Sequence, residues 1–174
     1  MSTAGRSALV VTASDGAAAG VRADESGALV EERLTDLGFT VERAIVEDEA
    51  WAIEEALVNG SDTHDLVVTT GGTGLTPRDV TPQATKAVLD YEVPGLAEAM
   101  RAAGRAKTPL ADLSRGLVGV RGRCLIVNLP GSPKGALESL EALVPLLDHA
   151  LETLAGPYDH GVTPDVPASN ASER

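Results

Sequence analysis

The chain alternates between short apolar runs and longer segments in which apolar residues recur every three or four positions. Short apolar or alternating runs are typical of strands, and the wider spacing is typical of helices that bury one face. The runs predict strands at residues 8–12, 39–46, 66–70, 117–120 and 124–129. The wider spacing predicts helices at residues 25–37, 49–59, 94–104 and 133–155, and a further helix that starts at Thr81-Pro82.

This order predicts an α/β fold with three layers, in which a mostly parallel sheet is flanked by helices on both faces. Residues 1–156 are expected to form a single domain, and residues 157–174, with prolines among small polar residues, a flexible C-terminal tail. Ligands in such folds bind beyond the carboxyl ends of the strands. Loops at residues 14–15, 47–48, 71–79 and 130–133 should therefore converge on one site.

The last predicted helix carries a proline in its interior. Pro145 lacks an N–H and should kink or split the helix near residues 141–144. An apolar seam at helical spacing runs along it and could serve either the core or a contact between subunits; it comprises Leu137, Leu140, Val144, Leu147, Leu151 and Leu154.

Composition narrows the class of partner. A net charge of −12 and only four aromatic residues argue against nucleic acid, which requires cations and stacking rings. Cys124 stands alone within an apolar run, as expected of a buried core thiol. No apolar stretch reaches the length of a membrane span and no signal-peptide pattern opens the chain, so we expect a cytoplasmic protein without a membrane partner.

The segment after the predicted strand 66–70 contains three glycines, at Gly71, Gly72 and Gly74, followed by Arg78-Asp79 and a helix start. Glycines allow backbone N–H groups to approach an anion closely, and a helix N-terminus favours negative charge. The segment matches neither the dinucleotide fingerprint nor the P-loop.

A second loop repeats the arrangement of strand, glycine and helix start. It contains Pro130, Gly131, Ser132 as the predicted N-cap, and Pro133. Lys134 could reach a phosphate or could be an ordinary solvated lysine. Both glycine-containing loops therefore favour a phosphorylated ligand.

Two aspartates complete the candidate chemistry. Asp48 could act at the site or simply cap the helix that follows, whereas Asp79 lies two residues before the expected cap Thr81 and is not needed for capping. Carboxylates beside a loop that holds phosphate suggest phosphoryl or nucleotidyl transfer assisted by Mg²⁺, which prefers oxygen ligands.

Several short motifs, in order along residues 7–156, resemble the MogA/MoaB-type family of molybdenum cofactor biosynthesis proteins. The matching segments are Ser14-Asp15, Asp24-Glu-Ser-Gly27, Glu47-Asp-Glu49, Thr69-Thr-Gly-Gly-Thr-Gly74 with Arg78-Asp-Val-Thr-Pro82, Val93-Pro-Gly-Leu96, Leu113-Ser-Arg-Gly116 and Asn128-Leu-Pro-Gly-Ser-Pro133. The resemblance implies a molybdopterin-binding-like fold and a molybdopterin adenylyltransferase, which uses Mg²⁺ and ATP to adenylylate molybdopterin and releases pyrophosphate.

The resemblance also implies roles for individual residues. The two aspartates essential in active members fall on Asp48 and Asp79, with Asp79 as the residue that positions the metal. The residues expected to contact substrate are Ser14, Asp15, Thr70, Gly71, Gly72, Thr73, Gly74, Ser114, Arg115, Pro130, Gly131, Ser132 and Lys134. A homotrimer and delivery to a downstream molybdotransferase are further implications.

The chain departs from the family at residues 21–23, where Val-Arg-Ala replaces a segment that often holds an aromatic, and Arg22 could supply a cation for phosphate. The alternative functions are a carrier or scaffold that binds molybdopterin without catalysis, the metal-inserting molybdotransferase step, and a regulatory nucleotide-binding module. The sequence leaves open molybdate or tungstate use and which loop holds adenine or pterin.

Overall fold

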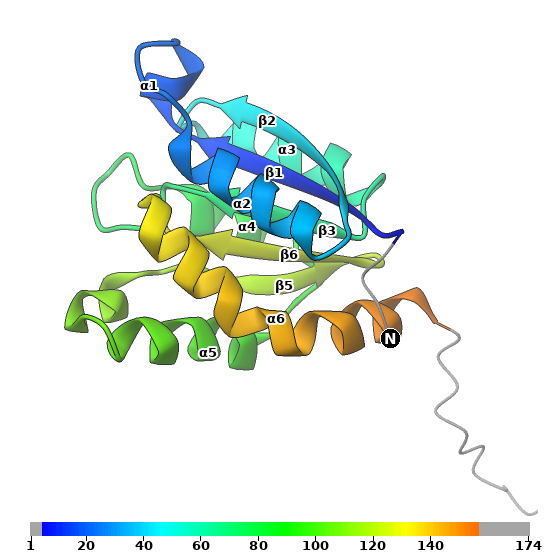
Figure 1. Cartoon of the computed structure of the whole chain (residues 1–174). Coiled ribbons are helices and arrows are strands. Elements are labelled where there is room, and N and C mark those ends of the chain that lie inside the picture. Colours follow the sequence, from blue (N-terminus) through cyan, green and yellow to red (C-terminus); the bar gives the residue numbers. More distant parts are fainter. Residues whose placement is uncertain (1–4, 157–174) are drawn as a thin grey trace, which may run out of the picture.

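The computed structural model describes residues 5–156; the predicted tail at residues 157–174 lies outside them. The central feature is a six-stranded sheet in the order β2-β1-β3-β6-β5-β4 (Figure 1). Its strands are β1 (Ser7–Ala13), β2 (Thr40–Val46), β3 (Leu66–Thr70), β4 (Tyr91–Glu92), β5 (Val118–Arg121) and β6 (Cys124–Leu129). β1, β2, β3 and β6 are mutually parallel, and β5 runs antiparallel to β6. The predicted α/β fold with a mostly parallel sheet is therefore confirmed.

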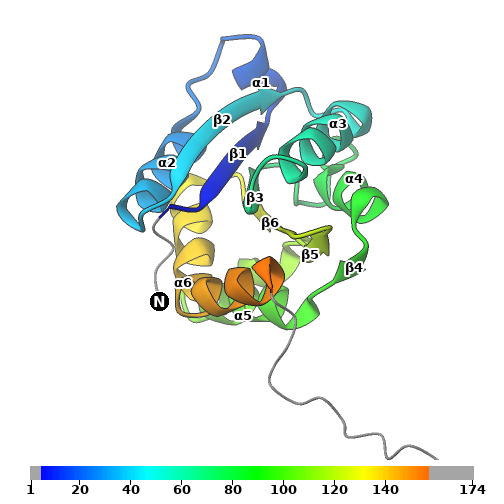
Figure 2. The same ribbon diagram turned by 90° about the vertical axis from the view of Figure 1, so that its right-hand side faces the viewer.

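Helices cover both faces of the sheet (Figure 2). One face packs against α2 (Glu25–Asp36), α5 (Pro94–Arg105) and α6 (Pro133–Ala155). The other face packs against α3 (Ala50–Ser61) and α4 (Thr81–Val88). Successive side chains of β1 point into opposite layers, with Val10 in the first core and Val11 in the second. A sheet buried on both faces explains why these strands read as continuous apolar runs.

Three short elements escaped the sequence analysis. They are α1 (Asp15–Ala18), the 3₁₀ helix η1 (Pro109–Leu113) and β4. α1 lies between the predicted strand at residues 8–12 and the predicted helix at residues 25–37. β4 contains only two residues and forms by antiparallel pairing with β5. Elements this short carry too few residues for a hydrophobic period.

Two predicted helix starts were wrong by a residue. α3 takes Glu49 as its N-cap residue, without a side-chain bond, so Asp48 is not the cap. α4 takes Val80 as its N-cap, so Thr81 is the first helical residue. α3 also continues through Gly60, which was expected beyond its end. For Asp48, a contact with a distant residue outweighs the local capping preference, as described below.

α6 remains one helix across Pro145 rather than splitting, and Figure 1 shows it changing direction about halfway along its length. Its buried line consists of Ala136, Leu140, Leu143, Leu147 and Leu151, all in the core. Leu143 rather than the predicted Val144 is fully buried, and Leu154 packs at the edge of the same core. Cys124 is buried as predicted, and burial raises the pKa of its thiol to about 12.

Because α6 packs into the hydrophobic core along one face only, substitutions of two of its leucines should affect stability unequally. Replacing Leu143, which is fully buried, with Ala should lower the free energy of unfolding by about 2–5 kcal/mol through lost contacts and a cavity. Leu146→Ala, at a position 45% exposed on the same helix, is the matched control and should cost less than about 1 kcal/mol. Urea titration of both variants measures the difference, and equal losses would contradict this assignment of the core.

Candidate functional site

The carboxyl ends of β1, β2, β3 and β6 open onto a cleft of about 640 Å³. This is the position at which parallel α/β sheets bind ligands. The loops that follow these strands supply most of the walls, and the segment before α2 closes one side. The cleft is lined by Thr12, Ala13, Ser14, Ala17, Arg22, Ala23, Asp24, Glu25, Ser26, Asp48, Thr70, Gly71, Gly72, Arg78, Asp79, Gly131, Ser132 and Pro133.

The turn after β3 requires glycine at two positions. Gly71 and Gly72 have φ values of +92° and +66°, a region that other residues rarely adopt. A Cβ on Gly71 would collide with the Ala13 carbonyl oxygen, and one on Gly72 would collide with the Thr81 hydroxyl. The Gly71 amide donates to the Leu129 carbonyl at 3.3 Å and so ties the turn to β6. This N–H therefore holds the floor of the cleft in place, rather than facing an anion as the glycine pattern suggested.

Asp79 is held in a fixed orientation by the loop it belongs to. Its Oδ2 accepts hydrogen bonds from the Thr76 hydroxyl at 2.6 Å and the Thr76 amide at 2.8 Å. These bonds, with the Thr76 hydroxyl as the main cause, hold the pKa of Asp79 below its usual value. Arg115 supports the same loop from behind, donating to the Gly74 carbonyl at 2.7 Å and the Asp79 carbonyl at 2.6 Å. Asp79 is thus an oriented carboxylate that stays ionised at neutral pH.

Asp48 forms a reciprocal pair with Asp15. The Asp15 amide donates to Asp48 Oδ2 at 3.0 Å, and the Asp48 amide donates to Asp15 Oδ1 at 2.9 Å. Burial raises the pKa of the Asp48 carboxyl above its usual value, and the nearby charges of Asp15 and Asp79 raise it further. The bond from the Asp48 amide, followed by that from Arg78, lowers the pKa of Asp15. This pair explains why Asp48 does not cap α3.

Arg78 bridges the loops of three strands. Its guanidinium donates to Asp15 at 2.7 Å and to Glu49 at 2.9 Å, while its backbone precedes Asp79. The two carboxylates raise the pKa of Arg78, Glu49 being the main cause, so the group is permanently charged. Because the side chain is 54% exposed, the ion pairs contribute little to stability. Their effect is to hold a cation in the wall of the cleft that Asp48 and Asp79 also line.

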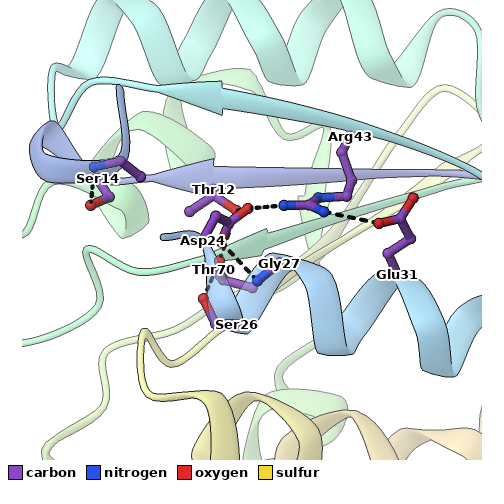
Figure 3. A network of polar contacts seen from close by, with 9 residues as sticks. Thr12, Ser14, Asp24, Ser26, Gly27, Glu31, Arg43 and Thr70 are labelled. Atoms are coloured by element: carbon purple, nitrogen blue, oxygen red, sulfur yellow. Dashed lines mark hydrogen bonds and ion pairs between the residues drawn. The ribbon is translucent and has the colours of Figure 1, made fainter. Parts of the chain in front are cut away.

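The opposite wall is built around Asp24, whose side chain is only 4% exposed (Figure 3). It caps α2 by accepting from the Gly27 amide at 2.9 Å, and it also accepts from Thr12 at 2.8 Å and Arg43 at 2.7 Å. Burial alone would raise the pKa of Asp24, but these bonds, chiefly that of Arg43, outweigh burial and lower it. One carboxylate therefore ties α2 to β1 and β2.

The structure brings most, but not all, of the sequence-predicted residues to the cleft. Those that line it are Ser14, Asp48, Thr70, Gly71, Gly72, Asp79, Gly131 and Ser132. Ser114 and Pro130 line a second cavity of about 290 Å³ between α5 and α6, which shares Ser132 with the cleft. Asp15, Thr73, Gly74, Arg115 and Lys134 line neither cavity; Asp15 and Arg115 instead hold Asp48 and the glycine loop. Lys134 is highly exposed and faces Glu138.

Thr12, Asp24 and Ser26 are among the cleft residues that were absent from the predicted contact set. Thr12 lies at the end of a buried strand, where threonine is an ordinary strand residue. Asp24 precedes a helix and is an ordinary N-cap. The family-matching segment Asp24-Glu-Ser-Gly27 was a signal for Asp24 and Ser26. Their contacts with the hydroxyls at the ends of β1 and β3 become visible only once the strands are paired.

The donor set of the cleft suits a hard cation held jointly with substrate. Asp48 and Asp79 offer carboxylate oxygens, the ligands Mg²⁺ prefers, and Mg²⁺ sites commonly use one or two carboxylates together with substrate phosphates. Among residues 5–156 no cluster of three or more His, Cys, Asp or Glu side chains could hold a metal alone. The residues therefore fit a metal that arrives with a phosphorylated substrate. Within the same residues no helix is long and apolar enough to cross a membrane.

Comparisons with known proteins agree on one family. Residues 9–149 match the family described as "Probable molybdopterin binding domain". A curated molybdopterin adenylyltransferase from Helicobacter pylori is 44% identical over 156 residues, covering 86% of this chain and 88% of the relative. The crystal structure of the molybdopterin biosynthesis enzyme MoaB from Thermus thermophilus is 49% identical, with a TM-score of 0.81 over 88% of this chain and 99% of that one. The molybdopterin biosynthesis Mog protein from Mycobacterium ulcerans is 46% identical, with a TM-score of 0.82 over 86% and 99%.

The opposite environments of the two aspartates predict opposite effects on stability. The pKa of Asp48 is higher in the folded state than in the unfolded state. Ionisation of Asp48 therefore lowers the stability of the fold as the pH rises above its unfolded pKa, and the loss is complete above its folded pKa. Asp48→Asn should therefore raise Tm by a few degrees at pH 7. The folded-state pKa of Asp79 is lowered, so its carboxylate stabilises the fold above the unfolded value of about 3.9, and Asp79→Asn should lower Tm.

Thermal unfolding from pH 3 to pH 8 tests both signs, with each variant as the control for the other. The Asp48→Asn difference should vanish below about pH 4, and the Asp79→Asn difference should shrink as pH falls through the folded pKa. Shifts of the same sign in the two variants at pH 7 would contradict the electrostatic description of the cleft.

Proposed function

We infer the function of this chain from its family: the chain belongs to the family of probable molybdopterin binding domains. We propose that it is a molybdopterin adenylyltransferase that uses ATP. The observation that carries the proposal is the cleft itself, in which Asp48 and Asp79 stand on separate loops beside the Gly71-Gly72 turn. The curated relative from Helicobacter pylori, 88% of which this chain covers, is a molybdopterin adenylyltransferase and supports the proposal.

The proposed reaction joins two phosphorylated substrates. A phosphate oxygen of molybdopterin attacks the α-phosphorus of ATP and forms a new phosphorus–oxygen bond. The bond from the α-phosphorus to the oxygen bridging it to the β-phosphorus breaks, and pyrophosphate leaves with that electron pair. Positioning and charge stabilisation, rather than covalent help from the protein, are the main requirements of such a transfer.

Asp79 would hold a Mg²⁺ ion that enters with the triphosphate. When bound, the ion offsets the negative charge on the phosphates. Asp79 is suited to fixed coordination, because Thr76 already orients its carboxylate and the group is ionised. Asp48 lies on a separate loop of the same cleft, and we assign it to positioning the molybdopterin phosphate or a water bound to the metal.

Two arginines supply positive charge in an otherwise acidic cleft. Arg78 lines the cleft with its guanidinium shared by Asp15 and Glu49, and Arg22 lines the side formed by the segment before α2. We propose that Arg78 faces the phosphates and keeps the loops that carry Asp48 and Asp79 at a fixed separation. Arg22 occupies the part of the sequence that departs from the family, so its contribution would be particular to this chain.

The resemblance further supports a homotrimer that acts in the cytoplasm and delivers its product to a downstream molybdotransferase. These assignments are parts of the proposal. The seam of α6 does not bear on the trimer, because its buried leucines already serve the core of one subunit.

Release of pyrophosphate provides the first test. The protein should release pyrophosphate from ATP only when molybdopterin and Mg²⁺ are both present, and Asp79→Asn and Asp48→Asn should each reduce the rate by at least about a hundredfold. Glu54→Gln, on α3 outside the cleft, is the matched control for loss of one carboxylate and should retain the full rate. A wild-type protein that binds molybdopterin tightly but releases no pyrophosphate would instead be a carrier or scaffold.

Arg78 should matter for substrate binding far more than for stability. Arg78→Ala is expected to raise the KM for ATP about tenfold, while Tm changes by no more than a degree or two because the side chain is exposed. Arg105 offers a matched control, since its side chain is similarly exposed and forms an ion pair with Asp112 at 2.7 Å. Neither Arg105 nor Asp112 lines the cleft. Arg105→Ala should leave KM unchanged. Equal effects of the two substitutions on KM would contradict the role assigned to Arg78.

A further inference from the structure

Four side chains form a continuous hydrogen-bonded chain along the floor of the cleft (Figure 3). The Ser26 hydroxyl donates to Thr70 at 3.2 Å, Thr70 to Thr12 at 3.3 Å, and Thr12 to Asp24 at 2.8 Å. Arg43 closes the far end by donating to the same Asp24 oxygen at 2.7 Å. All three hydroxyl-bearing residues are buried, and all line the cleft. The proposed chemistry of Asp48 and Asp79 makes no use of this chain.

The direction of every proton in the chain is fixed by its ionised end. Asp24 is paired with Arg43, so its carboxylate can only accept and Thr12 must donate to it. A hydroxyl has one proton, so Thr12 can then only accept from Thr70, and Thr70 can only accept from Ser26. The proton of Ser26 is thereby committed to Thr70. What Ser26 offers to the cleft is its oxygen lone pairs.

We propose that Ser26 is a specificity-determining residue, an obligate hydrogen-bond acceptor that selects a fixed N–H or amino donor on the heterocycle of one substrate. The selection follows from the direction of the hydrogen bonds, which run from Ser26 toward Asp24. A phosphate oxygen or a carbonyl would place an acceptor against an acceptor, whereas a hydroxyl could turn to suit either polarity and would not be selected. The proposal rests on the proposed function, since both of its substrates, ATP and molybdopterin, carry such donors.

The hydrogen-bonded chain also predicts that Thr12, which is linked to Ser26 through Thr70, decides whether the Ser26 hydroxyl donates or accepts toward the cleft. Thr12→Val removes the hydroxyl that links Thr70 to Asp24 with little change in shape. The Thr70 proton would then be free to turn toward Ser26, and the Ser26 proton could point into the cleft. The acceptor would become an adaptable hydroxyl, although Ser26 itself is unchanged. A role limited to local packing at Ser26 would not be sensitive to Thr12.

Isothermal titration with ATP and with molybdopterin, each in the presence of Mg²⁺, tests the proposal on the wild type, Ser26→Ala and Thr12→Val. One of the two ligands should lose about tenfold in affinity in Ser26→Ala, as expected for one hydrogen bond, and the identity of that ligand locates the donor. Thr12→Val keeps the Ser26 hydroxyl and should bind the same ligand with a smaller loss, its main effect being on selectivity. Ser26→Thr, which keeps the hydroxyl, should retain affinity within about threefold. Ser61→Ala is the control, because that hydroxyl bonds only its own helix at Val58.

A second comparison tests polarity. If ATP is the affected ligand, the wild type should prefer it to inosine triphosphate, in which a carbonyl replaces the amino donor, and Thr12→Val should lose most of that preference. If molybdopterin is affected, pterin should compete better than its 2-oxo counterpart lumazine, again only with Thr12 present. Unchanged affinity of both ligands in Ser26→Ala, or the same preference in the wild type and Thr12→Val, would overturn the proposal. Wild-type protein that binds neither ligand would overturn the proposed function itself.

Discussion

The turn at Gly71 and Gly72 is the constraint on which the rest of the site depends. β3 lies between β1 and β6, and its chain must leave the sheet through a gap bounded by the Ala13 carbonyl on one side and the Thr81 hydroxyl on the other. Only a backbone without Cβ atoms and with positive φ passes through that gap. The turn then places the following loop, and with it Arg78 and Asp79, across the ends of β1 and β2. The separation of the two aspartates is therefore a consequence of backbone sterics at the centre of the sheet.

The aspartates around this turn are of two kinds. Asp24 and Asp15 are neutralised by arginines and hold elements together: Asp24 joins α2 to two strands, and Asp15 fixes the loop of Asp48. Asp48 and Asp79 line the cleft, and neither has an arginine partner among the ion pairs of the described residues. The pKa of Asp48 is raised because its burial and its acidic neighbours oppose ionisation. Pairs of carboxylates whose environments push their pKa values apart are typical of catalytic sites.

The sequence predicted the fold well because the signals for it are local. Apolar runs marked β3 and β6 to the residue, and helical spacing marked the full extent of α6. The errors arose where a distant residue decides the outcome. Asp48 has the sequence context of an N-cap, but its carboxylate is engaged by an amide 33 residues earlier in the chain. Thr12 and Ser26 have the sequence context of ordinary strand and helix residues, and their hydroxyls meet only when β1, β3 and α2 are packed. Motif resemblance located the loops of the site, while the hydrogen bonds that give each side chain its role required the structure.

We propose that adenylyl transfer takes place in the cleft at the carboxyl ends of the parallel strands. Determining the crystal structure of the protein with adenylylated molybdopterin bound is the most direct test. We expect the bridging phosphates to lie against the Gly71-Gly72 turn, between Asp48 and Asp79 and within reach of Arg78. Phosphates bound instead in the second cavity between α5 and α6, with the turn and both aspartates free of ligand, would contradict it.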